Sequence, residues 1–251
     1  MLKILVIHST SMVGKSTAVA SLLHPRLNSP RVFSVEKQNQ DSSRYGINVE
    51  RYDTQDFQKL IDDVMLSTGD LIVDVGASQY VDVVNEFARI HGAVNDYDVV
   101  IVPTTPEGRY HEETIGTIET LRKVGLETEK LRVLFNRATI RAGQKLDSEF
   151  LPVIAYLTTE GLPCYEDLVV HDNKIHEGLR ATGVSFLEVV SDPTDYRKLF
   201  KAAQEKDPHS HETLTLQRRF NLQRTVAAVK LSLDKAFAAL RLPTVHLELE
   251  T

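Results

Sequence analysis

A short apolar stretch followed by a small polar loop at the N-terminus constrains the fold of this chain more than any other feature. Residues 2–7 are rich in β-branched side chains and too few for a helix, so they predict a buried strand. A loop at 8–13 leads to Gly-Lys-Ser-Thr at 14–17, and residues 18–23 are typical of a helix. The order of strand, loop, Gly-Lys-Ser-Thr and helix is the context of a phosphate-binding loop.

The backbone N–H groups of such a loop converge on one point, where the helix dipole favours an anion. In this pattern Lys15 would reach the β- and γ-phosphates, the Ser16 hydroxyl would bind Mg²⁺, and Thr17 would hold the α-phosphate. The first Gly of the usual pattern is replaced by Ser9, whose Cβ fits a tight loop less well. Taken alone, the four residues could simply start a helix with a Ser cap. Their place between an apolar strand and an apolar helix favours a nucleotide site.

A second strand end carries an acidic residue. Residues 71–78 read Leu-Ile-Val-Asp-Val-Gly-Ala-Ser, an apolar strand that ends in Asp74 with Gly76 close behind. An Asp at this end of a strand beside a phosphate loop can hold Mg²⁺ through water. The alternative is a strand that ends in a solvated Asp. In either case we expect the side chain to be exposed enough for its removal to leave the core closed.

Strands and helices alternate along the first 190 residues. Besides those above, strands are predicted at 31–35, 98–103, 131–135 and 150–157, and helices at 54–67, 81–90, 114–124 and 172–182. This order predicts an α/β fold whose mostly parallel sheet is covered by helices on both faces. Ligands of such sheets bind at the carboxyl ends of the strands. The loop at 9–17 and the side chains of Glu36, Asp74, Pro103 and Asn136 are expected there.

The composition limits the classes of protein to which this chain could belong and the compartment that it fits. A net charge of −6 over 251 residues argues against a generally basic, nucleic-acid-coating surface, although it leaves room for a local patch. Cys164 is the single cysteine, so no internal disulfide can form. The sequence has no run of about 18 apolar residues and no signal-peptide pattern before its first strand. We therefore expect a cytoplasmic protein.

Five motifs in this order resemble the ParA/MinD group of deviant P-loop ATPases. They are the phosphate loop, the strand end at Glu36, Asp-Val-Gly-Ala-Ser at 74–78, Val-Pro-Thr-Thr-Pro-Glu at 102–107 and Leu-Phe-Asn-Arg at 134–137. The resemblance covers about residues 1–190. Asp-x-Gly-Ala-Ser is especially similar to the plasmid proteins StbB, of plasmid stability, and TraL, of conjugation.

The resemblance implies a P-loop NTPase-like fold, ATP and Mg²⁺ as ligands, and a homodimer that sandwiches nucleotide and positions DNA or other cargo. It implies that Lys15 and Asp74 are catalytic, that Ser16 and Asp74 hold Mg²⁺, and that Asn136 contacts adenine. The residues expected to hold the nucleotide are Ser11, Met12, Val13, Gly14, Lys15, Ser16, Thr17 and Asn136.

Two departures from the group predict slow hydrolysis. The group has Lys-Gly-Gly-x-Gly-Lys-[Ser/Thr], and its first Lys reaches across the dimer to the partner's phosphates. That position is Thr10 here, followed by Ser11 and Met12, and Thr carries no charge. The group also often has Asp-x-Asp after the second strand, where this chain has Glu-Lys-Gln at 36–38. Gln38 is the candidate for orienting the attacking water, but Gln is a poor base.

The C-terminal part of the chain predicts a long helix. Residues 212–241 contain no Pro or Gly, are rich in Lys and Arg, and carry an apolar stripe at spacings of three and four. The stripe consists of Leu222, Val226, Val229, Leu233, Ala236 and Leu240. It could pack on its own domain, dock on an anionic membrane surface, or bind a protein, and we expect a protein interface. The predicted domains are 1–206, 212–241 as the basic helix, and 242–251 as a tail.

The leading functional hypothesis is a slow ATPase switch of plasmid stability, positioning or conjugative transfer. Its expected partners are a second copy and a plasmid-encoded DNA-binding or transfer protein. Direct DNA binding is left open, and so is a peripheral position at the inner membrane. The alternative is a degenerate nucleotide-binding scaffold that acts through partners. A GTPase would need Asn-Lys-x-Asp, which is not found, and a kinase would need more lid arginines than Arg137 and Arg141.

Overall fold

A seven-stranded sheet runs through the computed structural model, which describes residues 1–36, 41–53, 57–140 and 143–243. The strands lie in the order β3-β2-β4-β1-β5-β6-β7, and all neighbours pair in parallel. β1 is therefore central, with β4 and β2 on one side and β5 and β6 on the other. The strand bounds are β1 Lys3–Val6, β2 Arg31–Val35, β3 Glu50–Tyr52, β4 Leu71–Val75, β5 Val99–Thr104, β6 Leu131–Ala138 and β7 Val169–His171.

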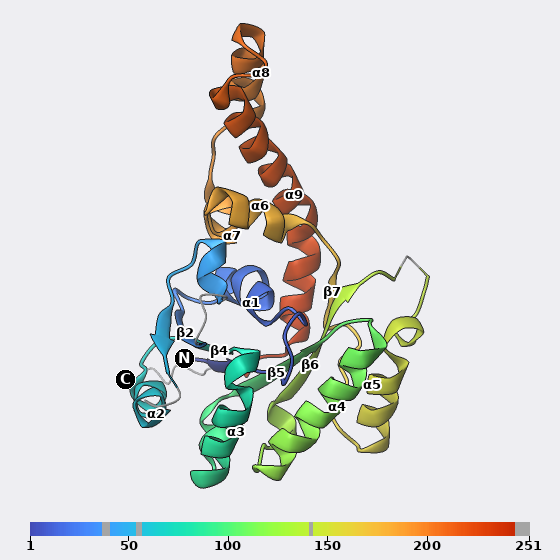
Figure 1. The fold of residues 1–251 in the computed structure, drawn as a ribbon. Helices are drawn as coiled ribbons and strands as arrows, with labels where there is room; N and C mark the ends of the chain where they lie inside the picture. The colour runs from blue at the N-terminus through green and yellow to red at the C-terminus, as the bar shows by residue number, and fades with distance from the viewer. Residues whose placement is uncertain (37–40, 54–56, 141–142, 244–251) are drawn as a thin grey trace, which may run out of the picture.

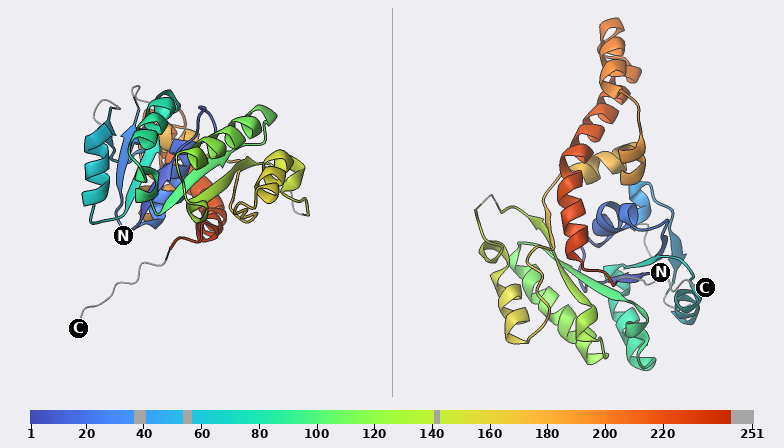
Figure 2. Two further views of the ribbon diagram at one scale, coloured as in Figure 1. Left: turned by 90° about the horizontal axis from the view of Figure 1, so that it is seen from below. Right: turned by 180° about the vertical axis from the view of Figure 1, so that it is seen from behind.

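Helices cover both faces of the sheet, as predicted (Figure 1; Figure 2). One face carries α2, α3, α4 and α5, and the other carries α1, α6, α7 and the C-terminal half of α9. Alternate residues of β1 serve the two layers: Ile4 and Val6 lie in one core and Leu5 in the other, all fully buried. The bounds are α1 Lys15–Ala18, α2 Phe57–Leu66, α3 Tyr80–Arg89, α4 Gly108–Lys123, α5 Asp147–Thr159, α6 Ile175–Thr182, α7 Phe186–Ser191, α8 Tyr196–Lys206 and α9 His211–Ala239, and α1 continues as a π-helical turn at Val19–Leu23.

The expected strand at 150–157 is wrong, because these residues belong to helix α5. Asp147 and Glu149 lie in its first turn, where the helix dipole favours carboxylates. Phe150 has a non-helical backbone (φ −125°, ψ 19°), and this kink lets the helix accommodate Pro152. The edge strands β3 and β7 are not predicted from sequence, since three residues are too few to show an alternating pattern.

The apolar stripe of α9 is buried against its own domain, so the expected protein interface on this stripe is wrong. Leu222, Val226, Leu233 and Leu240 are at most 4% exposed. They pack in the core cluster that α9 shares with α1, α6 and α7. Two polar contacts fasten the same half of the helix: Asp234 pairs with Arg26 at 2.8 Å, and the Leu240 carbonyl accepts from Arg132 Nε at 2.7 Å.

α8 and the N-terminal half of α9 form a helical hairpin that projects from the body of the molecule (Figure 1; Figure 2). The Phe200 and Phe220 rings stack across the hairpin with centroids 6.3 Å apart. Residues 207–210 form the turn between the two helices, where Ser210 caps α9 by accepting from the Thr213 N–H. The proposed domain ends at 206, 212 and 241 remain a prediction.

Candidate functional site

The loop between β1 and α1 has the shape of a phosphate cradle at the middle of the sheet. Gly14 has φ 88°, and a Cβ there would lie 2.1 Å from Asn136 Nδ2, so only glycine fits. Thr17 Oγ1 donates to the Gly14 carbonyl at 2.8 Å and holds the first helical turn. Ser11 and Met12 are exposed at the rim, and Val13 is fully buried.

Helix α4 accommodates the Ser9 that replaces the usual first glycine. The Ser9 N–H donates to Thr117 Oγ1 at 3.2 Å, and the Ser9 hydroxyl accepts from Thr117 Oγ1 at 3.0 Å and donates to Glu113 at 3.1 Å. Ser9 has no positive φ, so its Cβ causes no backbone strain. The departure from the usual pattern is therefore compatible with a closed loop.

Lys15 lies inside the loop, 7% exposed. Its ammonium donates to the Thr10 carbonyl at 2.8 Å and to the His8 carbonyl at 3.4 Å. Burial lowers the pKa of Lys15 to about 8, although Asp74 and Glu36 favour the charged form. The pKa of Lys15 is thus close to neutral pH, and a bound phosphate would favour the charged form of the amine.

His8 braces the loop, a role that the sequence analysis missed. Its Nδ1 accepts from the Thr10 N–H at 3.0 Å, so Nε2 carries the proton and donates to Thr114 Oγ1 at 3.1 Å. Burial and the nearby Lys15 lower the pKa of His8 to about 3, which keeps the ring neutral. In the sequence, the signal for this role is a histidine that directly follows the predicted strand at 2–7.

Asp74 lies at the end of β4, opposite Val6 of β1. It is 2% exposed, so the expectation of an exposed Asp is wrong. Neither carboxyl oxygen accepts a hydrogen bond, and the Ser16 and Ser42 hydroxyls lie nearby without reaching hydrogen-bond geometry. Burial raises the pKa of Asp74 to about 6, despite these hydroxyls and Lys15. Two buried oxygens without partners are suited to a cation or its water.

A cavity of about 430 Å³ opens over the loop and joins side chains from both halves of the sheet. From the β2 side comes Glu36, whose Oε1 accepts from Ser78 at 2.7 Å, and from the β6 side comes Arg137. A Cβ at Gly76 would lie 1.9 Å from Glu36 Oε2, so a larger residue there would displace the Glu36 carboxylate. The full lining is Ser11, Met12, Gly14, Lys15, Ser16, Thr17, Glu36, Arg44, Tyr45, Gly76, Ala77, Ser78 and Arg137.

Asn136 fastens the loop from the β6 side. Its Nδ2 donates to the Val13 carbonyl at 2.9 Å, its Oδ1 accepts from the Arg137 N–H at 3.0 Å, and the side chain is 4% exposed. The adenine contact therefore stays a prediction. Gln38, the expected water-orienting residue, lies outside the described residues. Arg44, Tyr45 and Arg137 belong to the cavity but not to the predicted site: no local motif marks Arg44 and Tyr45, and Arg137 ends the motif at 134–137 without a predicted binding role.

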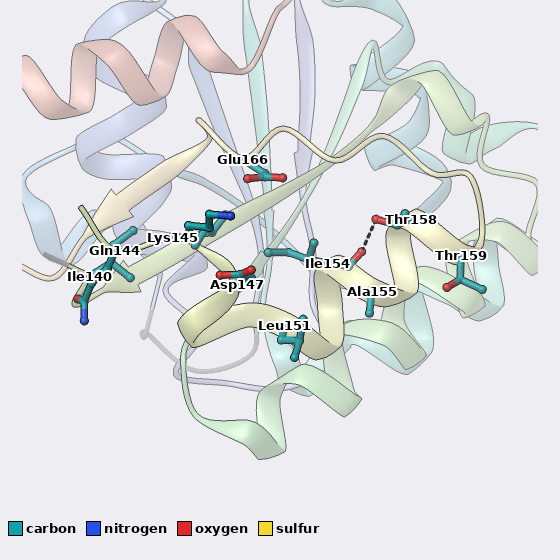
Figure 3. A pocket seen from close by; sticks show the side chains of 11 residues that line it. Ile140, Gln144, Lys145, Asp147, Leu151, Ile154, Ala155, Thr158, Thr159 and Glu166 are labelled. Carbon is teal, nitrogen blue, oxygen red and sulfur yellow. Dashed lines mark hydrogen bonds between the residues drawn. The ribbon is translucent and has the colours of Figure 1, made fainter. Parts of the chain in front are cut away.

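A second cavity, of about 750 Å³, lies along α5 and shares no residue with the first (Figure 3). Its walls combine apolar side chains such as Leu151 and Ile154 with the charged Lys145, Asp147 and Glu166. The described residues that line it contain no Gly-Lys-Ser-Thr motif between a strand and a helix, so the smaller cavity over the phosphate loop is the candidate site.

Neither a preformed metal cluster nor a membrane-spanning helix is found among the described residues. No group of three or more His, Cys, Asp or Glu there could hold a metal ion by itself, so Ser16 and Asp74 would need water and phosphate oxygens to complete a Mg²⁺ shell. No helix in the described part is long and apolar enough to cross a membrane.

Comparison with known proteins identifies the fold. No protein-family model and no curated protein matches the sequence. Among solved structures, the chain is similar to the MinD cell division protein of Aquifex aeolicus at 12% identity and a TM-score of 0.53, covering 91% of this chain and 97% of that one. The MinC:MinD cell division protein complex of Aquifex aeolicus matches at 13% identity and a TM-score of 0.51, over 91% and 96%. The chain thus has the P-loop fold of the MinD type.

Proposed function

We propose that this chain is a nucleotide switch of the ParA/MinD type that binds ATP with Mg²⁺ and hydrolyses it slowly. The observation that carries the proposal is the loop of residues 9–17, which closes under the cavity with Lys15 buried inside it. Asp74 supports it, because two buried carboxyl oxygens without partners face the same region. The MinD-type fold places these groups at the carboxyl ends of the strands, where such sheets bind ligands.

In this proposal each part of the chain has a separate task. The backbone N–H groups at 13–17 bind the phosphates, and Lys15 adds a charged donor. Ser16 and Asp74 hold Mg²⁺, directly and through water, and the metal when bound neutralises charge on the phosphate oxygens. Gln38 orients the attacking water, and the Asn136 amide contacts adenine once it exchanges its bond to the loop.

The first test is a fluorescent ATP titration of the parent protein and of Lys15→Ala. We expect saturable, Mg²⁺-dependent binding by the parent, and binding about 10- to 100-fold weaker for the variant, since a charge-assisted hydrogen bond is lost. Lys145→Ala is the matched control, because Lys145 is an exposed lysine that lines the second cavity. If Lys145→Ala weakened binding and Lys15→Ala did not, the site would be misassigned.

The second test concerns turnover. With Thr10 in place of the lysine that the resemblance implies, we expect the parent to turn over on the order of 10⁻³ s⁻¹ or less, as phosphate-loop hydrolases do without a completing cation. Thr10→Lys should raise turnover and strengthen ATP-dependent dimerisation, measured by phosphate release and sedimentation velocity. Thr159→Lys adds the same charge at an exposed position of α5 and should change neither. Fast turnover by the parent alone would contradict this prediction.

Thr10 stands where the ParA/MinD group has its first lysine, and this difference also supports an alternative function, a degenerate nucleotide-binding scaffold. A scaffold that binds nucleotide would show saturable binding without hydrolysis, even with a partner added. A chain without saturable ATP binding would leave only a nucleotide-free scaffold. Phosphate release with and without DNA separates these outcomes from the switch.

The biological setting is part of the proposal. The resemblance of residues 74–78 to StbB and TraL supports plasmid stability, positioning or conjugative transfer. The single cysteine, Cys164, fits a cytoplasmic protein, and a peripheral position at the inner membrane stays open. We propose a homodimer and a plasmid-encoded partner. The projecting hairpin supports a partner of acidic surface, because residues 196–224 contain seven Lys or Arg against three Asp or Glu in a chain of net charge −6.

A further inference from the structure

Two arginines that line the cavity form no salt bridge with any of the described residues. Among the described residues, the guanidinium groups of Arg44 and Arg137 form neither a salt bridge nor a hydrogen bond, although both border the cavity over the phosphate loop. The neighbouring Arg51 is paired, with Asp41 at 2.7 Å. An unpaired guanidinium beside a phosphate cradle has its five donors available for an anion.

The backbone at Arg137 turns its side chain toward this cavity. Asn136 and Ala138 pair with consecutive residues of β7, so Arg137 is the extra residue of a β-bulge. Its φ is 54°, in the left-handed region that non-glycine residues rarely adopt. A bulge redirects a side chain and is often found beside an active site. A regular β6 would have given residue 137 a different direction.

Arg44 is carried by a short 3₁₀ turn, Ser42–Tyr45, that is fixed at both ends. At its start Asp41 accepts from the Ser43 N–H at 3.0 Å, and at its end Gly46 has φ 75° and lies so close to the chain before α7 that a Cβ would be 2.5 Å from the Ser185 nitrogen. The Asp41 carboxylate binds Arg51 rather than Arg44, so the Arg44 guanidinium has no salt bridge among the described residues.

The charges around the cavity leave a positive surplus for a ligand. Lys15 interacts electrostatically with two carboxylates, Asp74 and Glu36, which both favour its charged form. The charged side chains that line the cavity are Lys15, Arg44, Arg137 and Glu36, which give the lining a net charge of +2 when all are ionised. A nucleoside triphosphate carries several negative charges, which a guanidinium can bind through two parallel hydrogen bonds.

We propose that Arg44 and Arg137 bind the phosphates of the nucleotide from within the same chain, and so contribute to nucleotide affinity without the lysine that Thr10 replaces. The assignment rests on the proposed function of ATP binding at this cavity and extends it. It makes nucleotide affinity a property of the single chain, while Lys15 and the loop backbone keep their own contacts.

The test measures the affinity for labelled ATP, ADP and AMP, with Mg²⁺, in the full-length parent, Arg137→Gly and Arg44→Gln. Each variant should bind ATP about tenfold or more weakly, bind ADP with a smaller loss, and bind AMP nearly as the parent does, because the lost contacts are to phosphate. Arg137→Gly suits the positive φ, so its melting temperature should equal or exceed that of the parent. Arg197→Gln, at an exposed arginine of α8, is the matched control and should change no affinity.

A further variant separates charge from shape. Arg137→Lys keeps the positive charge and should bind ATP more tightly than Arg137→Gly. Equal weakness of these two variants would overturn a charge-based role, and an equal loss for ATP and AMP would assign the arginines to the base or ribose instead. ATP binding at parental strength in both arginine variants would overturn this proposal alone. A parent that binds no ATP would overturn the proposed function itself.

Discussion

Leu233→Ala is expected to lower the free energy of unfolding by about 2–5 kcal/mol, the range for a large-to-small change in a closed core. Leu233 is 1% exposed and packs in the cluster that joins α9 to α1, α6 and α7. Leu231, two residues earlier on the same helix, is 66% exposed. Leu231→Ala is therefore the matched control and should change stability by less than about 0.5 kcal/mol. Urea denaturation followed by circular dichroism measures both.

A small effect of Leu233→Ala would mean that the stripe of α9 is a free surface in solution, and the protein-interface hypothesis would return. The expected result also decides how partner binding can be studied. Deleting residues 212–251 would remove Leu222, Val226, Leu233 and Leu240 from the core, at roughly 1.5–3 kcal/mol each. The total of roughly 6–12 kcal/mol rivals the stability of a whole domain, so the shortened chain should not fold. Charge substitutions on the projecting hairpin are the better test of a partner.

The sequence predicts the sheet well where strands are long and buried. Residues 31–35 and 131–135 are mostly apolar because these strands are covered on both faces, and the structure confirms both strands. The prediction of a strand at 150–157 is wrong because an apolar run that contains a proline is compatible with a kinked helix as well as with a strand. The stripe of α9 shows that spacing reveals an apolar face but not what covers it.

The site is predictable only as far as local motifs reach. Gly14 and Lys15 are identified because the strand, loop and helix that position them are consecutive in the chain. Arg44 and Arg137 are 93 residues apart, and sheet order and a bulge bring both to the cavity. Arg137 ends the motif at 134–137, but the motif does not show that a bulge turns this side chain toward the cavity. The burial of Asp74 is missed because a strand end in a central position is covered by the loops of its neighbours.

Asp74→Asn is expected to make the ligand-free protein more stable, by about 1–3 kcal/mol, and to abolish the dependence of ATP binding on Mg²⁺. The gain should arise because the substitution removes a buried charge whose two oxygens have no hydrogen-bond partner. The loss should arise because an amide is a much weaker ligand for Mg²⁺ than a carboxylate. Stability is measured by urea denaturation in EDTA, and binding by fluorescent ATP titration with and without Mg²⁺.

Asp41→Asn is the matched control, because Asp41 is equally buried, at 2% exposed, but fully partnered. Its carboxylate accepts from the Ser43 N–H at 3.0 Å and from Arg51 Nε at 2.7 Å, and these bonds lower its pKa even though burial alone would raise it. Asp41→Asn should therefore destabilise the protein while leaving the Mg²⁺ dependence in place. Opposite signs of stability at two aspartates of equal burial would show that Asp74 is kept for a ligand at the expense of stability. Destabilisation of both, with Mg²⁺ dependence intact in Asp74→Asn, would instead make Asp74 a structural residue and move the metal site elsewhere.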